Sequence, residues 1–196
     1  MRTAPISCPP LWLMRHSETE WNRAGRMQGR QDSPLTEKGR AQADALAPRL
    51  LALGFGPEVR LFSSPQGRAR DTARRAFADL GRPVSEDARL SEISVGACEG
   101  LTRGEIEARW PGLIEPARPF DWYPRAPGGE GEAAFRLRVA SFLGDLRGPA
   151  AIVAHGMTIR MIRSLILGLD WDGLMRLPGG QGNIFLARDG VVQDLG

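Results

Sequence analysis

The sequence predicts an α/β fold built around a largely parallel sheet. Three short apolar runs are typical of buried strands, and each is followed along the chain by a stretch with the apolar periodicity of a helix. Strands that alternate with helices form a sheet covered by helical layers. The chain has 196 residues, 42% of them hydrophobic, and neither an internal repeat nor a long linker divides it. We therefore expect residues 1–196 to form a single domain.

The first strand and the first long helix are predicted from two different patterns. Leu11–Met14 is an uninterrupted apolar run, which is typical of a buried strand. From Thr36 onward the apolar residues recur at spacings of three and four, which is the period of a helix with one buried face. This spacing runs through Ala43, Leu46, Leu50 and Leu53, and Gly54 marks the expected end of the helix.

Two further strand–helix pairs and a hairpin complete the predicted fold. The pairs are the strand Val59–Phe62 with a helix from about Gln66 to Leu80, and the strand Ala150–Ala154 with a helix from Met157 to Leu169. The hairpin joins Ile184–Arg188 to Val191–Asp194 through Asp189-Gly190, a dipeptide that favours a tight turn.

The charge of the chain is basic but evenly distributed. The formal net charge is +3 and the isoelectric point is about 9.5, values that invite comparison with nucleic-acid-binding proteins. The basic residues, among which Lys38 is the one lysine, are interleaved with acidic residues and form no basic tract. We therefore expect no nucleic-acid partner.

The chain is also expected to be cytoplasmic and to make no membrane contact. No stretch approaches the roughly 20 consecutive apolar residues that a membrane-spanning helix needs. The first ten residues lack the continuous apolar region of a secretory signal. Cys8 and Cys98 are isolated thiols, as is typical of a reduced compartment. The sequence leaves the oligomeric state open.

Both histidines lie where an α/β sheet usually forms its binding site. His16 follows the first predicted strand almost at once, and His155 directly follows Ala150–Ala154. Ligands bind beyond the carboxyl ends of such strands. Two histidines and two distant cysteines do not readily form a zinc site, and the glycine-rich loop of a nucleoside-triphosphate cradle is missing. Counting does not exclude a carboxylate magnesium site, but no Asp-rich strand end suggests one, so we expect no metal and no other cofactor.

Five blocks of sequence stand out around these histidines. They are Arg15-His16-Ser17-Glu18-Thr19-Glu20-Trp21-Asn22, Gly25–Gly39, Ser63–Ala73, Leu90–Gly100 and Ala154-His155-Gly156. In this order, between about residues 11 and 168, the blocks resemble the motifs of the histidine phosphatase superfamily, the phosphoglycerate-mutase-like group. The resemblance implies a three-layer α/β/α sandwich and catalysis through a phosphohistidine.

The first and third of these blocks are expected to supply a nucleophile and a phosphate-binding site. Phosphoryl transfer chiefly requires positioning and neutralisation of the charge on the phosphoryl oxygens. Arg15 and Arg68 offer rigid bidentate donors for these oxygens. The resemblance implies that Asn22 adds an amide donor and that a neutral ring nitrogen of His16 attacks phosphorus. The nearby guanidinium groups should lower the pKa of His16 and keep it unprotonated.

The remaining two catalytic residues take their expected roles from the resemblance. Glu92 is expected to protonate the leaving alkoxide and then, as a carboxylate, to activate the water that hydrolyses the phosphohistidine. His155 is expected to hydrogen-bond the transferring phosphoryl group, either as a cation or as a neutral donor, and so to stabilise charge in the transition state.

Four more residues are candidates for the pocket. Gln28 and Gly29 are expected to border the phosphate, and Gly156 follows the second histidine. Ser17 departs from the family pattern, which has Gly directly after the nucleophile. Ser17 either crowds the pocket, donates its hydroxyl to the phosphate, or opens a helix as the first residue of a capping box, and we favour the capping box.

Residues 101–132 are expected to form an irregular excursion over the site that selects the substrate. The alternative is an ordinary surface connection. The segment is rich in Pro, Gly, Arg and aromatic residues, and it suggests a phosphomonoester with a further anionic or planar group. The residues concerned are Arg109, Trp110, Arg118, Trp122, Tyr123 and Arg125.

Within the family, the sequence favours a phosphatase that hydrolyses a small-molecule phosphomonoester. The interval between Glu92 and His155 is short compared with that of phosphoglycerate mutases, and Pro127-Gly-Gly-Glu130 resembles a phosphatase motif. The alternatives are a cofactor-dependent phosphoglycerate mutase, or a phosphate-binding regulatory protein with negligible turnover. The natural substrate is not readable from the sequence.

Overall fold

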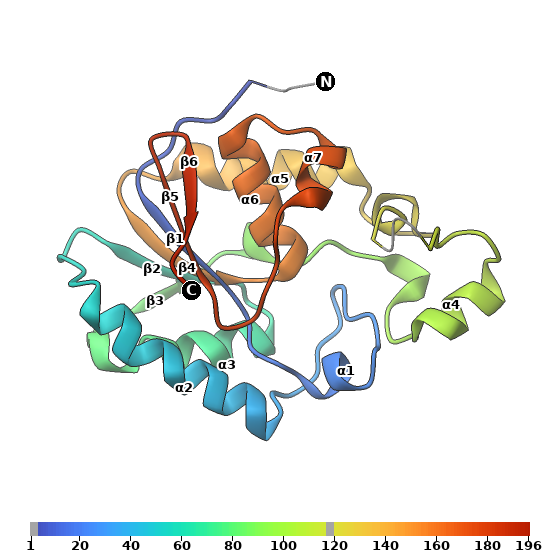
Figure 1. Ribbon diagram of the computed structural model, residues 1–196, viewed down its shortest axis with the longest axis horizontal. Coiled ribbons are helices and arrows are strands. Elements are labelled where there is room, and N and C mark those ends of the chain that lie inside the picture. Colours follow the sequence, from blue (N-terminus) through green and yellow to red (C-terminus); the bar gives the residue numbers. More distant parts are fainter. Residues whose placement is uncertain (1–3, 117–119) are drawn as a thin grey trace.

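The centre of the fold is a mixed sheet whose larger part is parallel (Figure 1). The computed structural model describes residues 4–116 and 120–196, and within them the sheet has six strands in the order β3-β2-β4-β1-β5-β6. The first four strands in this order are parallel, whereas β5 is antiparallel to β1 and β6 is antiparallel to β5. The strands are β1 (Leu11–Arg15), β2 (Arg60–Ser63), β3 (Val84–Glu86), β4 (Ala150–Ala154), β5 (Ile184–Arg188) and β6 (Val191–Asp194).

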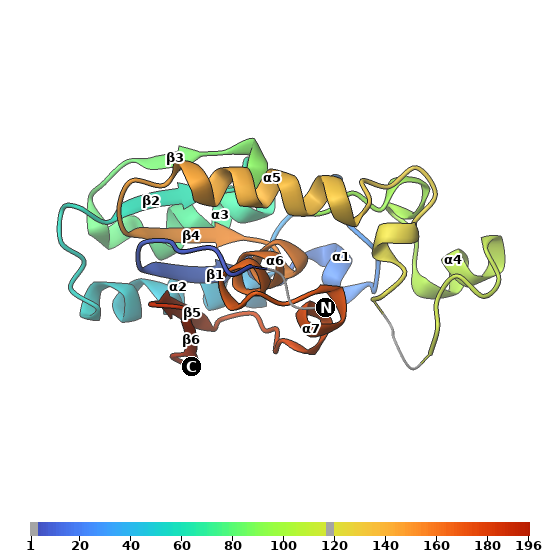
Figure 2. The ribbon, with the colours of Figure 1, turned by 90° about the horizontal axis from the view of Figure 1, so that it is seen from above.

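Helices cover both faces of this sheet, so the predicted α/β class is confirmed (Figure 1). One face carries α5 (Glu132–Asp145), α6 (Gly156–Leu167) and α7 (Trp171–Arg176), and the other carries α2 (Glu37–Ala52) and α3 (Gly67–Ala76). Two short helices, α1 (Glu20–Arg23) and α4 (Arg103–Arg109), lie outside these layers, and α4 projects away from the sheet in both views (Figure 2). None of the helices in the described ranges has the length and apolarity needed to cross a membrane.

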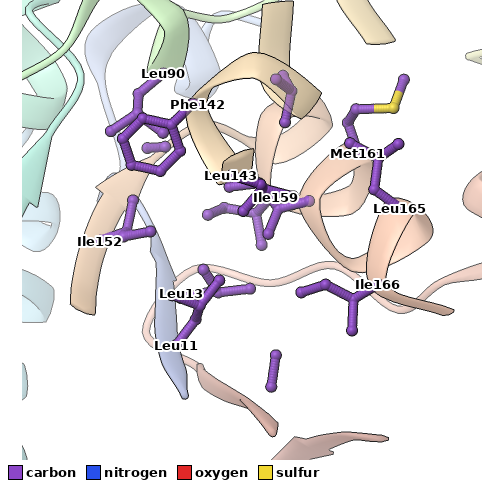
Figure 3. Packing of buried hydrophobic residues seen from close by; sticks show 14 of the residues in the cluster. Leu11, Leu13, Leu90, Phe142, Leu143, Ile152, Ile159, Met161, Leu165 and Ile166 are labelled. Atoms are coloured by element: carbon purple, nitrogen blue, oxygen red, sulfur yellow. The ribbon is translucent and has the colours of Figure 1, made fainter. Parts of the chain in front are cut away.

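Alternate residues of the central strands face the two helical layers. Leu11 and Leu13 of β1 pack with Ile152 of β4 against α5 and α6 (Figure 3). Met14 and Val153 belong instead to the cluster formed with α2 and α3. Every residue of β4 is fully buried, because helices cover this strand on both faces and other strands flank it. This double burial explains why its sequence is continuously apolar rather than alternating.

Strand β3 and the helices α4, α5 and α7 were not assigned from the sequence. Strand β3 is a three-residue edge strand with two exposed residues, so it has no apolar run to reveal it. Helix α5 does have the helical spacing, through the buried residues Phe135, Val139 and Phe142, and this signal was available in the sequence. The helix expected to extend to Leu80 ends at Ala76, and a 3₁₀ turn follows it.

The segment 101–132 is more ordered than an irregular excursion. It contains α4 and a 3₁₀ turn at Tyr123–Arg125, and its apolar residues form a small core of their own with Val95 and Cys98. Where the segment returns to the main body, Arg138 of α5 binds both carboxylate oxygens of Glu130, at 2.6 and 2.8 Å. Arg118 lies outside the described residues.

The capping box that opens α1 is formed by Thr19, so the capping role predicted for Ser17 is wrong. The Thr19 hydroxyl accepts the Asn22 N–H at 3.1 Å, and the Asn22 side chain accepts the Thr19 N–H at 3.2 Å. Ser17 lies two residues too early, where its N–H donates to the Thr72 hydroxyl of α3 at 3.1 Å. The Ser17 hydroxyl is buried and has no hydrogen-bond partner in the described structure.

Replacing Ser17 and Thr19 by Ala in two separate variants should therefore have different effects on the free energy of unfolding. Thr19→Ala removes a helix cap and should lower the free energy of unfolding by about 1 kcal/mol. Ser17→Ala removes an unpaired buried hydroxyl and should leave that free energy unchanged or raise it by up to about 1 kcal/mol. Urea unfolding of both variants measures the difference. An equal loss in the two variants would restore Ser17 as a cap.

Candidate active site

The two histidines are brought together by the pairing of β1 with β4. The parallel register sets Arg15 opposite Ala154, and the His16 N–H donates to the Ala154 carbonyl at 2.8 Å. The residue after each strand end is a histidine, so His16 and His155 become neighbours with ring centroids 5.2 Å apart. This position is the one that the sequence predicted from the carboxyl ends of parallel strands.

A cavity of about 290 Å³ opens in front of His16. Seven of the ten residues predicted for the site line it: Arg15, His16, Asn22, Gln28, Gly29, Arg68 and Glu92. Ser17, His155 and Gly156 are not part of its wall. A larger and more open groove of about 710 Å³ runs along α3 and β3, but neither histidine lines it, so we place the chemistry in the smaller cavity.

His16 is held in the tautomer that a nucleophile requires. Its Nδ1 lies 2.8 Å from the Ser17 carbonyl, which can only accept a hydrogen bond, so Nδ1 carries the proton and Nε2 carries the lone pair. The ring is 3% exposed. Burial lowers the pKa of His16 well below its ordinary value of 6.5, and the charges of Arg15 and Arg68 lower it further. The ring is therefore neutral at physiological pH.

The two expected phosphate-binding arginines differ in how much of each guanidinium is already engaged. Arg68 donates to the Gln31 and Gly29 carbonyls, at 2.7 and 3.0 Å, and forms a 2.9 Å ion pair with Asp32. Its buried Nε has no partner within the described structure, and neither has the buried Nε of Arg15. Burial lowers the pKa of Arg15, and the charge of Glu92 opposes this shift. Both side chains thus keep a buried N–H that an anion would satisfy.

Three further pocket residues present backbone or amide groups. The amide oxygen of Asn22 accepts from Thr19 and from Gln181, the latter at 3.1 Å, so its NH₂ group is the part that remains to donate to a ligand. The Gln28 amide oxygen is buried with no partner in the described ranges. Gly29 has φ +50°, and a Cβ at this position would lie 2.4 Å from the Glu99 carboxylate, so another residue would be strained here and would displace that side chain.

The carboxylate of Glu92 is fixed at the first turn of α6. One oxygen accepts the Ile93 N–H at 3.0 Å and both the N–H and the hydroxyl of Thr158, each at 3.1 Å. The other oxygen accepts the Met157 N–H at 3.0 Å. A helix N-terminus is a favourable place for a carboxylate. The same helix begins directly after His155, so the expected acid and the second histidine share one support.

His155 lies next to His16 and is fully buried. Its Nε2 is 2.8 Å from the Ser64 hydroxyl, whereas its Nδ1 has no partner in the part of the chain described. Burial lowers the pKa of His155 well below 6.5, and the charge of Arg68 adds to the shift. Of the two forms expected for this residue, the neutral donor is therefore the one that the site favours. Gly156 begins α6 beside the Arg15 guanidinium, at a distance that would tolerate a Cβ.

Sequence reasoning missed several residues of the site. Ser64 and Gln66 lie in a block that was recognised, yet no role was assigned to them. Gln66 links two parts of the pocket, because it accepts the Glu92 N–H at 2.8 Å and donates to the Gly29 carbonyl at 2.9 Å. The outer wall of the cavity comes from Gly25, Arg26, Met27, Ile93, Val95, Phe120 and Tyr123. Of these, Tyr123 was named in advance among the aromatic residues of the segment 101–132, and the same aromatic content was the available signal for Phe120.

No group of three or more His, Cys, Asp or Glu side chains that could hold a metal ion occurs within residues 4–116 and 120–196. The cavity contains one carboxylate, that of Glu92, and its oxygens are engaged by backbone N–H groups and Thr158. The expectation of metal-independent chemistry stays a prediction.

The fold sets a strand-end histidine beside two arginines and a carboxylate at the carboxyl edge of a parallel sheet. The chain belongs to the histidine phosphatase superfamily (branch 1), whose family model matches residues 11–187. The resemblance inferred from the five sequence blocks is therefore confirmed.

Relatives of known name lie on both sides of the division between phosphatase and mutase. A glucosyl-3-phosphoglycerate phosphatase of Mycolicibacterium vanbaalenii is 34% identical over 186 residues, which cover 88% of this chain and 80% of that protein. A "Probable phosphoglycerate mutase GpmB" of an Enterobacter species is 34% identical over 164 residues, with 81% and 75% covered. The solved structure of Bacillus stearothermophilus YhfR superposes with a TM-score of 0.77 at 31% identity and 95% coverage of both chains. At the level of the family and of its phosphatase relatives, the predicted phosphoric monoester hydrolase is confirmed.

The depressed pKa values of the two histidines predict how stability and activity depend on pH. The unfolded chain binds protons on both rings below about pH 6.5, whereas the folded chain binds them only at lower pH. Their contribution to stability should be complete above pH 6.5 and should decline as the pH falls below it. Loss of kcat/KM through protonation of His16 should likewise occur only below pH 6.5. Urea unfolding and kinetics between pH 5 and 8 measure both effects, and a ring titrating at or above 6.5 would contradict the prediction.

Proposed function

We propose that this protein hydrolyses small phosphomonoesters in two steps through a phosphohistidine on His16. The observation that carries the proposal is the Nε2 lone pair of His16, which lies in the same cavity as Arg15, Arg68 and Glu92. A nucleophile, two cations and a carboxylate are the groups that phosphoryl transfer to a side chain requires. The phosphatase named among the relatives supports the same activity.

In the first step, the Nε2 lone pair forms a bond to phosphorus while the bond from phosphorus to the leaving oxygen breaks. Glu92, in its protonated form, gives its proton to that oxygen. In the second step, a water oxygen attacks phosphorus, Glu92 takes the proton of the water, and the N–P bond breaks with its electron pair returning to Nε2. Each cycle releases an alcohol and inorganic phosphate and restores both residues.

The arginines stabilise the charge that the phosphoryl oxygens carry throughout. The buried Nε–H groups of Arg15 and Arg68 have no partner within the described ranges, so a bound phosphoryl group would satisfy both. Because Arg68 is already anchored by Asp32 and two carbonyl oxygens, it is oriented before the substrate binds. Such preorganised donors stabilise a transition state without a cost of reorganisation.

The outer wall of the cavity offers apolar and aromatic surface to a leaving group. The side chains that surround the space beyond the arginines are Met27, Ile93, Val95, Phe120 and Tyr123. Two cations lie on this side: Arg26 is paired with Glu105 at 3.2 Å, and Arg160 lies 6.0 Å from the centre of the Phe120 ring. Aromatic walls bind planar groups through their faces and edges. We therefore propose a compact substrate with one phosphate and a planar or apolar organic group.

Phosphoglycerate mutase activity is the second candidate, because several relatives carry that name. A mutase transfers the phosphoryl group to a phosphoglycerate, which requires a further anion-binding group for the carboxylate of the acceptor.

The expected cytoplasmic location, the single-domain organisation and the lack of a nucleic-acid partner stay predictions.

The covalent step predicts that phosphate labelled on the substrate passes through His16. Rapid quenching should trap a base-stable, acid-labile phosphoramidate, and His16→Ala should abolish both the trapped label and turnover. In the presence of 3-phosphoglycerate, the label should leave the wild-type enzyme as inorganic phosphate, since the proposed activity is hydrolysis. Turnover retained by His16→Ala would overturn the mechanism, and transfer to 3-phosphoglycerate would instead favour the mutase.

The role of Glu92 predicts an effect that depends on the leaving group. Glu92→Gln should reduce kcat for alkyl phosphates by roughly 10²–10⁴-fold, the usual range for a general acid. The loss should be smaller for aryl phosphates, because phenolate leaving groups need little protonation. Because Gln also loses hydrogen bonds to α6, Thr158→Val serves as a control that removes one of these bonds and keeps the carboxylate. Equal losses for both substrate types would contradict an acid role.

A further inference from the structure

The second histidine is fully buried and is bonded to one side chain that no part of the proposed reaction uses. His155 Nε2 lies 2.8 Å from the Ser64 hydroxyl, and both residues have no exposed surface. Ser64 follows β2 directly, and its own N–H donates to the Val153 carbonyl of β4. The contact therefore joins the ends of two neighbouring strands.

The other hydrogen bonds of Ser64 decide which of the two groups is the donor in this contact. The Ser64 oxygen already accepts the Gln66 N–H at 3.3 Å. A hydroxyl has one hydrogen to donate, and within the described ranges His155 Nε2 is the acceptor in reach of it. If His155 donated instead, the hydroxyl hydrogen would be buried without an acceptor, which is costly. Ser64 is therefore the donor, and Nε2 is the acceptor.

We propose that the Ser64 hydroxyl is a positioning group that holds His155 as the Nδ1–H tautomer and so makes this ring a donor to the phosphoryl group on His16. The inference rests on the proposed function. With Nε2 engaged, Nδ1 is the ring atom left to contact a ligand, and it is buried without a partner in the described structure. A bare nitrogen lone pair at this position would repel phosphoryl oxygens, whereas an N–H stabilises them.

The two rings are then matched in their roles. A carbonyl oxygen accepts a hydrogen bond from the Nδ1–H of His16, and the Nε2 lone pair of that ring is left for attack. A hydroxyl donates a hydrogen bond to Nε2 of His155, so Nδ1 carries the ring proton. That N–H is left to contact the oxygens of the phosphoryl group. Each tautomer is set by the group that contacts the other nitrogen of the ring.

Nitrogen NMR tests this assignment directly, because the chain contains two histidines in all. Uniform ¹⁵N-histidine labelling and a His16→Asn variant for assignment give the proton position on each ring near pH 7.5. We expect Nδ1–H on His155 in the wild type and a shift toward Nε2–H in Ser64→Ala, with the His16 signals unchanged. A wild-type His155 protonated on Nε2 would overturn the proposal without any measurement of activity.

Kinetics supply the second readout. Ser64→Ala should lower kcat by about tenfold or more, short of the roughly 10²–10³-fold lost when a transition-state donor is removed outright, with a smaller change in KM. Ser64→Thr, which keeps a hydroxyl, should recover most of the rate. Ser63→Ala is the matched control, since Ser63 is a buried neighbour that donates to the Ser64 carbonyl at 2.9 Å, and it should retain kcat.

The outcomes separate this inference from the proposed function. If Ser64→Ala keeps both the wild-type tautomer and the wild-type kcat, Ser64 does not position His155. If the tautomer shifts but kcat is unchanged, the donor role of His155 is wrong while the phosphohistidine mechanism stands. Turnover by the His16→Ala variant would instead contradict the phosphohistidine mechanism itself. Should Ser64→Ala fail to fold, the wild-type spectrum alone decides the tautomer.

Discussion

The register between β1 and β4 is the constraint on which the site depends. It sets Arg15 opposite Ala154 and bonds the His16 N–H to the Ala154 carbonyl, so a sheet hydrogen bond fixes the positions of two histidines that lie far apart in the sequence. Both strands contribute alternate residues to two hydrophobic clusters, one on each face of the sheet. A slip of one residue would turn every side chain to the opposite face, and the core therefore protects the geometry of the catalytic residues.

The carboxyl end of β4 also positions the other residues of the candidate site. Helix α6 begins directly after His155, and its first N–H groups hold the carboxylate of Glu92. Ser64, at the end of the next strand, contacts His155, and Gln66 fixes both the backbone of Glu92 and the carbonyl of Gly29. A small number of hydrogen bonds thus connects the nucleophile, the acid and the phosphate-binding loop to one edge of one sheet.

Electrostatics in the cavity reconcile two opposing requirements. Phosphoryl oxygens need positive charge close by, whereas a nucleophilic histidine must not itself be protonated. Burial and the charges of Arg15 and Arg68 lower the pKa of His16, so the guanidinium groups proposed to bind the substrate also keep the proposed nucleophile neutral. Burial has the same effect on His155, whose contribution is then that of an N–H dipole rather than of a cation.

The sequence by itself determined the class of the fold and most of the strands, because apolar runs and helical spacing are local features. It also supplied half of the residues that line the cavity, through the strand-end histidine and the motifs shared with a known family. It placed His16, Arg68 and Glu92 in one pocket although they come from three separate segments. It misassigned the helix cap, because Ser17 and Thr19 both fit a capping pattern and only the path of the backbone against Thr72 of α3 decides between them. Tertiary structure alone decided the ring contacts: the carbonyl of Ser17 follows His16 in the chain, but only the folded backbone turns it toward Nδ1, and the hydroxyl of Ser64 reaches His155 from a different strand.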